Sequence, residues 1–134
     1  MYLPHIILTT VLTISIANAK EPIQITTLVK AHTYTAPIRE AIQTSAEHDI
    51  EIINNTDKFQ SFSYLYQYCP EEEPCINTEN TVSVAPNTTW NNHHQSFAWT
   101  NYFSRGYYNL KAHTIVNSHT LHSQADDTGT VSVK

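Results

Sequence analysis

The stretch FQSFSYLYQYC, residues 59–69, decides the fold class of this chain. Every second residue from Phe62 to Tyr68 is aromatic, and most of the residues between them are polar. This period of two is typical of a β-strand that buries one face. The stretch therefore predicts a strand with one aromatic face, made by Phe62, Tyr64, Tyr66 and Tyr68.

Further short segments have the composition of strands, because they are rich in Val, Ile, Thr and aromatic residues. Residues 23–35 contain adjacent apolar residues, Leu28 and Val29, and form either one kinked strand or two short strands. The other predicted strands are residues 49–53, 81–85, 96–103, 107–116 and 128–133. Short strands at this spacing favour an all-β domain, an antiparallel β-sandwich or barrel.

One segment between these strands is ambiguous. Residues 36–48, APIREAIQTSAEH, place Pro37 where a first helical turn accepts it, and Ile38 lies four residues before Ile42. A short helix near residues 37–47 and an extended crossing segment fit this pattern equally well.

The turns depend little on glycine, because the chain contains only two. Pairs of Asn, Asp and Pro predict turns at residues 54–55, 86–87, 91–92 and 126–127. We expect the polar residues 117–127 to connect the last two strands.

The segment SRGYYNL, residues 104–110, resembles the Gly-x-Tyr corner that opens the sixth strand of immunoglobulin-like domains. Gly106 and Tyr108 match that corner. The resemblance implies an immunoglobulin-like sandwich in which the Tyr108 hydroxyl bonds a nearby backbone group. It also implies that Leu110 packs where antibody domains carry a disulfide.

The first 19 residues have the features of a cleavable signal peptide. Residues 6–16 form an apolar stretch, and Ala17-Asn18-Ala19 is an A-x-A cleavage site before Lys20, although no Lys or Arg precedes the apolar stretch. The stretch is too short for a membrane span. We therefore expect a secreted or periplasmic domain of residues 20–134, without a stable membrane span.

The two cysteines fit an oxidising compartment. Cys69 and Cys75 enclose five residues and predict a local disulfide, which stabilises the fold by about 2 kcal/mol in the loop-entropy model. A redox dithiol or a metal pair is disfavoured, because the spacing is not C-x-x-C and neighbouring carboxylates raise a thiol pKa.

Charge and motifs exclude several functions. The net charge is −5 and the seven Lys and Arg residues are scattered, so nucleic acid is not an expected partner. No nucleophile elbow or phosphate-binding loop is present, and the acidic runs at 71–73 and 126–127 have the composition of solvated surface. We expect a non-enzymatic domain that needs no cofactor.

The histidines suggest an alternative, a zinc- or copper-binding protein. His113, His119 and His122 could share a metal with Asp126 or Asp127 as the fourth ligand. Independent solvated histidines explain the same residues. A third possibility is a pH-responsive surface, because protonation of the seven histidines after residue 19 would reverse the net charge.

Aromatic residues crowd into WNNHHQSFAWTNYFSRGYY, residues 90–108. Alternation places Phe97, Trp99 and Phe103 in the core and points Tyr102 and Tyr107 outward. An exported binding domain of this kind would use a sheet face, or loops at 90–94 and 69–75, to hold a protein or carbohydrate. The candidate contact residues are Trp90, His93, His94, Tyr102 and Tyr107.

Overall fold

The computed structural model describes residues 21–134, so the predicted signal peptide, residues 1–19, lies outside the described residues. Those described contain eight strands and no helix. The strands are β1 (Ile23–Ala31), β2 (Tyr34–Ala36), β3 (Ala41–Asn54), β4 (Gln60–Pro70), β5 (Ile76–Val84), β6 (Thr88–Asn101), β7 (Gly106–Asn117) and β8 (His122–Val133).

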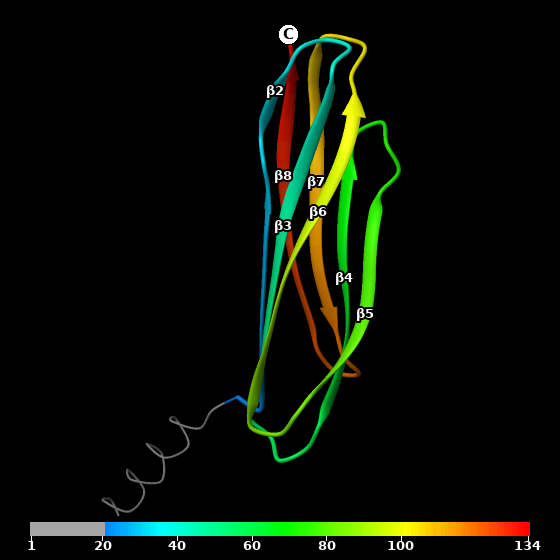
Figure 1. Cartoon of the computed structure of the whole chain (residues 1–134). Helices are drawn as coiled ribbons and strands as arrows, with labels where there is room; N and C mark the ends of the chain where they lie inside the picture. The colour runs from blue at the N-terminus through cyan, green and yellow to red at the C-terminus, as the bar shows by residue number, and fades with distance from the viewer. Residues whose placement is uncertain (1–20) are drawn as a thin grey trace, which may run out of the picture.

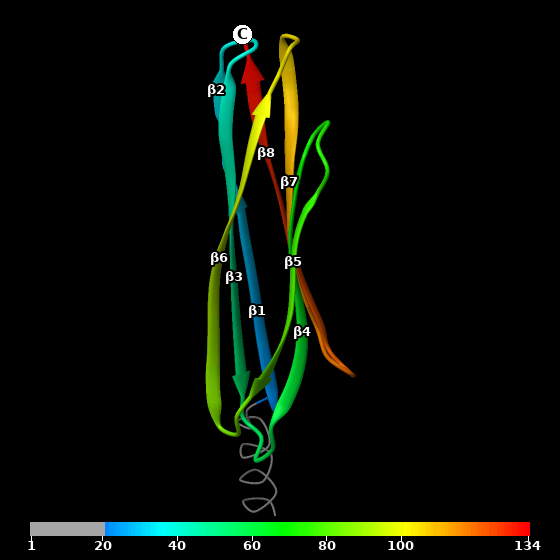
Figure 2. The same cartoon turned by 45° about the vertical axis from the view of Figure 1, so that its right-hand side comes forward.

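The strands form two packed sheets, which confirms the predicted immunoglobulin-like β-sandwich. One sheet has the order β1-β3-β6, and the other has the order β2-β8-β7-β4-β5. Figures 1 and 2 show that most strands run along the long axis of an elongated molecule. The pairs are antiparallel except for β2 and β8, which are parallel. Residues 23–35 thus form two strands, one in each sheet, instead of one kinked strand.

Strand β4 confirms the prediction made from its alternation. Its aromatic residues all point inward and are buried: Phe62, Tyr64, Tyr66 and Tyr68. They belong to two hydrophobic clusters that follow one another along the sandwich. One surrounds Tyr68, Leu110 and Val131, and the other surrounds Tyr66, Ile50 and Val116.

A row of buried polar side chains lies between the two clusters. It consists of His48 on β3, Ser96 on β6 and Thr114 on β7, which we call the polar belt. On either side of His48 along β3, Ala46 belongs to the first cluster and Ile50 to the second. The middle of the sandwich is therefore held by hydrogen bonds rather than by apolar packing.

Of the two alternatives for residues 36–48, the extended segment is confirmed and the short helix near residues 37–47 is wrong. The chain turns at Ile38 and Arg39, and Arg39 has a positive φ of 67°, after which β3 begins at Ala41. The first half of β3 shows no alternation of apolar and polar residues, because its buried positions are Thr44, Ala46 and His48. Ile38 and Ile42, which suggested a helical stripe, pack against the first cluster.

Two predicted turns are also wrong. Residues 91–92 lie inside β6, so residues 90–94 are strand and not loop, and residues 126–127 lie inside β8. In the first half of β8 the inward residues are Ser123, Ala125 and Asp127, which are polar or small. The polar segment 117–127 therefore holds half a strand, and its connection is limited to residues 118–121.

The resemblance to the immunoglobulin corner is confirmed in detail. The Tyr108 hydroxyl donates a hydrogen bond of 2.7 Å to the carbonyl oxygen of Ser104, and Leu110 is fully buried in the first cluster.

Candidate functional site

The aromatic residues of β6 face the opposite way from the prediction. Phe97 is 50% exposed and Trp99 is 68% exposed, whereas Ser96 and Thr100 point into the sandwich and are buried. Phe103 is also exposed and Tyr102 is only 2% exposed, so both predictions were wrong. The prediction that Tyr107 points outward is confirmed, and it is 76% exposed at the start of β7.

Phe97 and Trp99 lie on the outer face of the β1-β3-β6 sheet, one pleat apart. Their cross-strand partners on β3 are Ser45 and Gln43. Ser45 is fixed in turn, because its backbone N–H and its hydroxyl lie 2.9 and 3.0 Å from the Tyr34 hydroxyl. We call the surface made by Gln43, Ser45, Phe97 and Trp99 the aromatic face.

Below the aromatic face the same sheet surface becomes acidic. Glu47 and Asp49 on β3 are paired with histidines, with 3.2 Å between Glu47 and His32 and 2.7 Å between Asp49 and His93. Beside these pairs is an open groove of about 500 Å³, lined by Thr26, Leu28, Asp49, Ile50, Glu51, Asn91, Asn92 and His93. The candidate residue His93 is therefore an exposed member of an ion pair at this groove.

The other candidates of segment 90–94 point into the sandwich. Trp90 is partly buried, with its ring 5.4 Å from that of Tyr64, and the His94 ring stacks on Tyr66 at 4.9 Å and an interplanar angle of 5°. Burial, followed by the charge of His93, lowers the pKa of His94. These two residues are thus part of the packing at the edge of the polar belt.

His48, at the centre of that belt, was missed by sequence reasoning. It is 0% exposed, and its Nδ1 and Nε2 lie 3.0 and 3.1 Å from the hydroxyls of Thr114 and Ser96. Burial, with a smaller contribution from His94, lowers the pKa of His48 to about 4. One signal was available in the sequence, since His48 is in phase with the buried Ile50 and Ile52.

The residues of the metal hypothesis do not converge. His113 pairs with Asp126 across β7 and β8, whereas His122 lies opposite Asn117, four residues further along β7 and about 13 Å away. His119 lies in the turn between these strands. Within residues 21–134 no three His, Cys, Asp or Glu side chains are placed to share a metal ion. The hydrogen bond to His113, supported by that from Gln124, lowers the pKa of Asp126.

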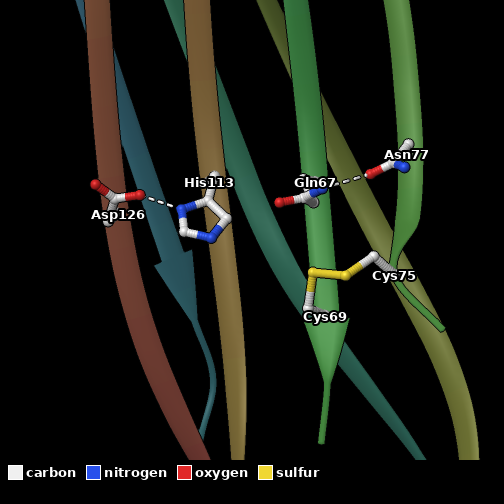
Figure 3. The surroundings of a disulfide bond; sticks show 6 residues. All are labelled: Gln67, Cys69, Cys75, Asn77, His113 and Asp126. Atoms are coloured by element: carbon white, nitrogen blue, oxygen red, sulfur yellow. Dashed lines mark hydrogen bonds and ion pairs between the residues drawn. A yellow bond between two sulfur atoms is a disulfide. The ribbon is translucent and has the colours of Figure 1, made fainter. Parts of the chain in front are cut away.

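Cys69 and Cys75 form the predicted disulfide, with an S–S distance of 2.05 Å. Figure 3 shows it joining the end of β4 to the segment before β5, next to the side-chain pairs Gln67–Asn77 and His113–Asp126. The acidic loop that it closes is exposed, yet Glu71 accepts a hydrogen bond of 2.6 Å from the backbone N–H of Asn109. The loop is therefore attached to the sheet as well as solvated.

Comparisons with known proteins return similar structures only. No protein family and no curated protein matches the sequence. A FixG-related protein from Vibrio parahaemolyticus is 10% identical, with a TM-score of 0.42, over 86% of this chain and 99% of that one. The CARDB domain of a Pyrococcus furiosus protein is 14% identical, with a TM-score of 0.40, over 87% and 97%. A PapD-like domain of human CEP192 is 8% identical, with a TM-score of 0.34, over 87% and 89%.

No helix that could cross a membrane is found in the part of the chain that the structure describes.

Proposed function

We propose that this chain is an exported, non-enzymatic binding domain and that the aromatic face is its contact surface for a protein partner. The observation that carries the proposal is the exposure of Phe97 and Trp99, which stand about 7 Å apart on one strand. The core does not need them, because β6 fills its share of the interior with smaller residues such as Ser96 and Ala98. Large aromatic side chains in this position are typical of binding hot spots.

The surroundings of the two rings also suit a protein partner. Gln43 and Ser45 are uncharged, so an apolar side chain can cover the rings without burying an ion. The groove further along the same sheet offers Glu51 to a partner's polar or basic groups. The combination of an apolar centre and a polar margin is the usual anatomy of a protein interface.

Selection from a library of random linear peptides displayed on phage tests the aromatic face. We expect the selected peptides to lose at least about 10-fold in affinity for Trp99→Ala and for Phe97→Ala, as hot-spot truncations do. Phe59→Ala is the matched control, because Phe59 is equally exposed but lies in the β3–β4 connection. Peptides that bind all three variants as tightly as the original chain would place the contact surface elsewhere.

A glycan array run with the same variants separates the two ligand classes. Glycan binding that is lost with Trp99→Ala, together with no peptide recovered, would assign the aromatic face to carbohydrate instead of protein.

Export is tested through the disulfide. The full chain, expressed in a host with an oxidising export compartment, is expected to lose residues 1–19 and to yield a product that a thiol-alkylating reagent leaves unmodified. A chain that starts at residue 20 stays in the cytosol and is expected to be alkylated at both Cys69 and Cys75. Full-length chain with two free thiols in the cytosol would contradict export.

A further inference from the structure

Strand β6 is the free edge of its sheet over its whole length. The order β1-β3-β6 leaves one side of this 14-residue strand without a neighbouring strand. Figure 2 shows the lower part of β6 along the margin of the molecule, with β3 on its inner side. The edge is therefore accessible to another strand.

The hydrogen bonds of β3 identify which backbone groups of β6 point to this edge. The Ser45 N–H and C=O are both used on the β1 side of β3, by Tyr34 and His32, so Thr44 and Ala46 bond to β6. Their partners are Ala98 and Ser96. The even-numbered residues of β6 thus form the backbone hydrogen bonds to β3. The odd-numbered residues, from Thr89 to Asn101, direct their N–H and C=O groups away from β3, toward the open edge.

The other sheet edges carry protection that β6 lacks. The edge of β1 lies against β8, where Asp127 accepts the Ala31 N–H at 2.8 Å and Gly129 packs under the His32 carbonyl. Strand β2 has three residues, and β5 is shorter than β6 and carries Glu79. Strand β6 contains no Lys, Arg, Asp, Glu or Pro, the residues that normally prevent edge pairing.

We infer that two copies of this chain pair through β6, antiparallel and about a two-fold axis. The pairing would join the two β1-β3-β6 sheets into one six-stranded sheet. At full overlap the seven odd-numbered residues of each copy give about 14 backbone hydrogen bonds, as many as a standard protein interface contains. This inference stands apart from the proposed function, although the pairing would also bring the two aromatic faces onto one surface.

A second copy fits this edge better than a free peptide does. A second β6 is already an extended strand, so pairing does not require the ordering entropy that a flexible peptide loses. Because β6 is uncharged, no register of the antiparallel pair places permanent like charges opposite each other. The nearest carboxylates, Glu47 and Asp49, are engaged by His32 and His93.

The molar mass in solution tests the inference. By analytical ultracentrifugation the oxidised chain is expected at about twice the monomer mass at about 100 μM and to dissociate on dilution. Gln95→Pro removes one edge-directed N–H without touching the β3 ladder and is expected to be monomeric. Gln95→Ala keeps that N–H and is expected to remain a dimer. A monomeric original chain, or a dimeric Gln95→Pro variant that retains its circular dichroism spectrum, would overturn the inference.

Amide hydrogen exchange of the original chain tests the inference even if the proline variant does not fold. In the dimer the N–H groups of Gln95, Phe97 and Trp99 are expected to be protected, and dilution should expose them. The N–H groups of Ser96 and Ala98 stay protected at every concentration, because they bond to β3. Rapid exchange of the odd-numbered amides in a sample that is dimeric by mass would place the interface elsewhere.

Discussion

Replacing Asn54 with aspartate is expected to lower the free energy of unfolding by about 4 kcal/mol, because the change buries a negative charge and turns one of its oxygens toward three carbonyl oxygens. Asn54 is fully buried at the end of β3. Its Nδ2 donates to the carbonyl oxygens of Lys58, Val84 and Ala85 at 2.8, 3.0 and 3.1 Å. Aspartate has the same shape but directs an oxygen toward all three carbonyls. Urea denaturation at pH 7 measures the change.

Asn55→Asp is the matched control. The Asn55 side chain makes one exposed hydrogen bond, to the Glu21 carbonyl at 2.9 Å, so we expect a loss below about 1 kcal/mol. Equal losses for the two variants would show that the three carbonyl contacts contribute nothing. A large loss at Asn54 alone would establish that one amide holds together the β3–β4 connection and the end of β5, from which the chain turns into β6.

The sequence was informative wherever buried positions were apolar or aromatic. Strand β4 follows directly from its alternation, and the corner at Tyr108 follows from a pattern of glycine and tyrosine that needs a specific backbone shape. The disulfide follows from the presence of only two cysteines, which lie six positions apart in the sequence. In each case the side chain that predicts the feature is also the side chain that makes it.

The pattern failed along the polar belt. Hydrophobic periodicity detects a strand only if its buried face is apolar, and the inward residues around the belt are His48, Ser96 and Thr114. Burial of these polar groups costs little free energy because they hydrogen-bond to one another. The partners are distant in the sequence, so no local pattern reveals them. The amino-terminal half of β3 was therefore undetectable as a strand.

Strand β6 reverses the pattern, with Ser96 inside and Phe97 outside. Local consistency is most often broken at functional surfaces, so this failure of the prediction is itself support for the aromatic face. The expected convergence of the metal-ligand candidates failed for a different reason, namely strand register. Spacing along the chain placed His113 near His122, but the β7–β8 hairpin separates them by four positions.

Acidification from pH 7 to pH 4 is expected to lower the free energy of unfolding by about 3 kcal/mol through His48 alone. The pKa of His48 is about 4 in the folded chain and 6.5 in its ordinary state, so the unfolded chain binds the extra proton first. Stability is complete above pH 6.5, falls as the pH decreases, and reaches its full loss below pH 4. The lowered pKa of His94 acts in the same direction. Urea denaturation at a series of pH values measures the slope.

The groups that face His48 offset this loss only in part, because the backbone of His113 and the charge of Asp49 raise the pKa of His48 by less than burial lowers it. These groups are His94 on β6, Tyr66 on β4, His113 on β7 and Asp49 on its own strand, and only the last is an anion, engaged by His93. His48→Gln keeps donors and an acceptor near Ser96 and Thr114 but does not titrate. The free energy of unfolding that this variant loses between pH 7 and pH 4 should therefore be smaller than the loss of the original chain by the same amount, about 3 kcal/mol. His122→Gln, on the exposed end of β8, should leave the slope unchanged. An imidazole of His48 that titrates near pH 6.5 in the folded chain by NMR would show that the polar belt is open to water, and the predicted slope would then vanish.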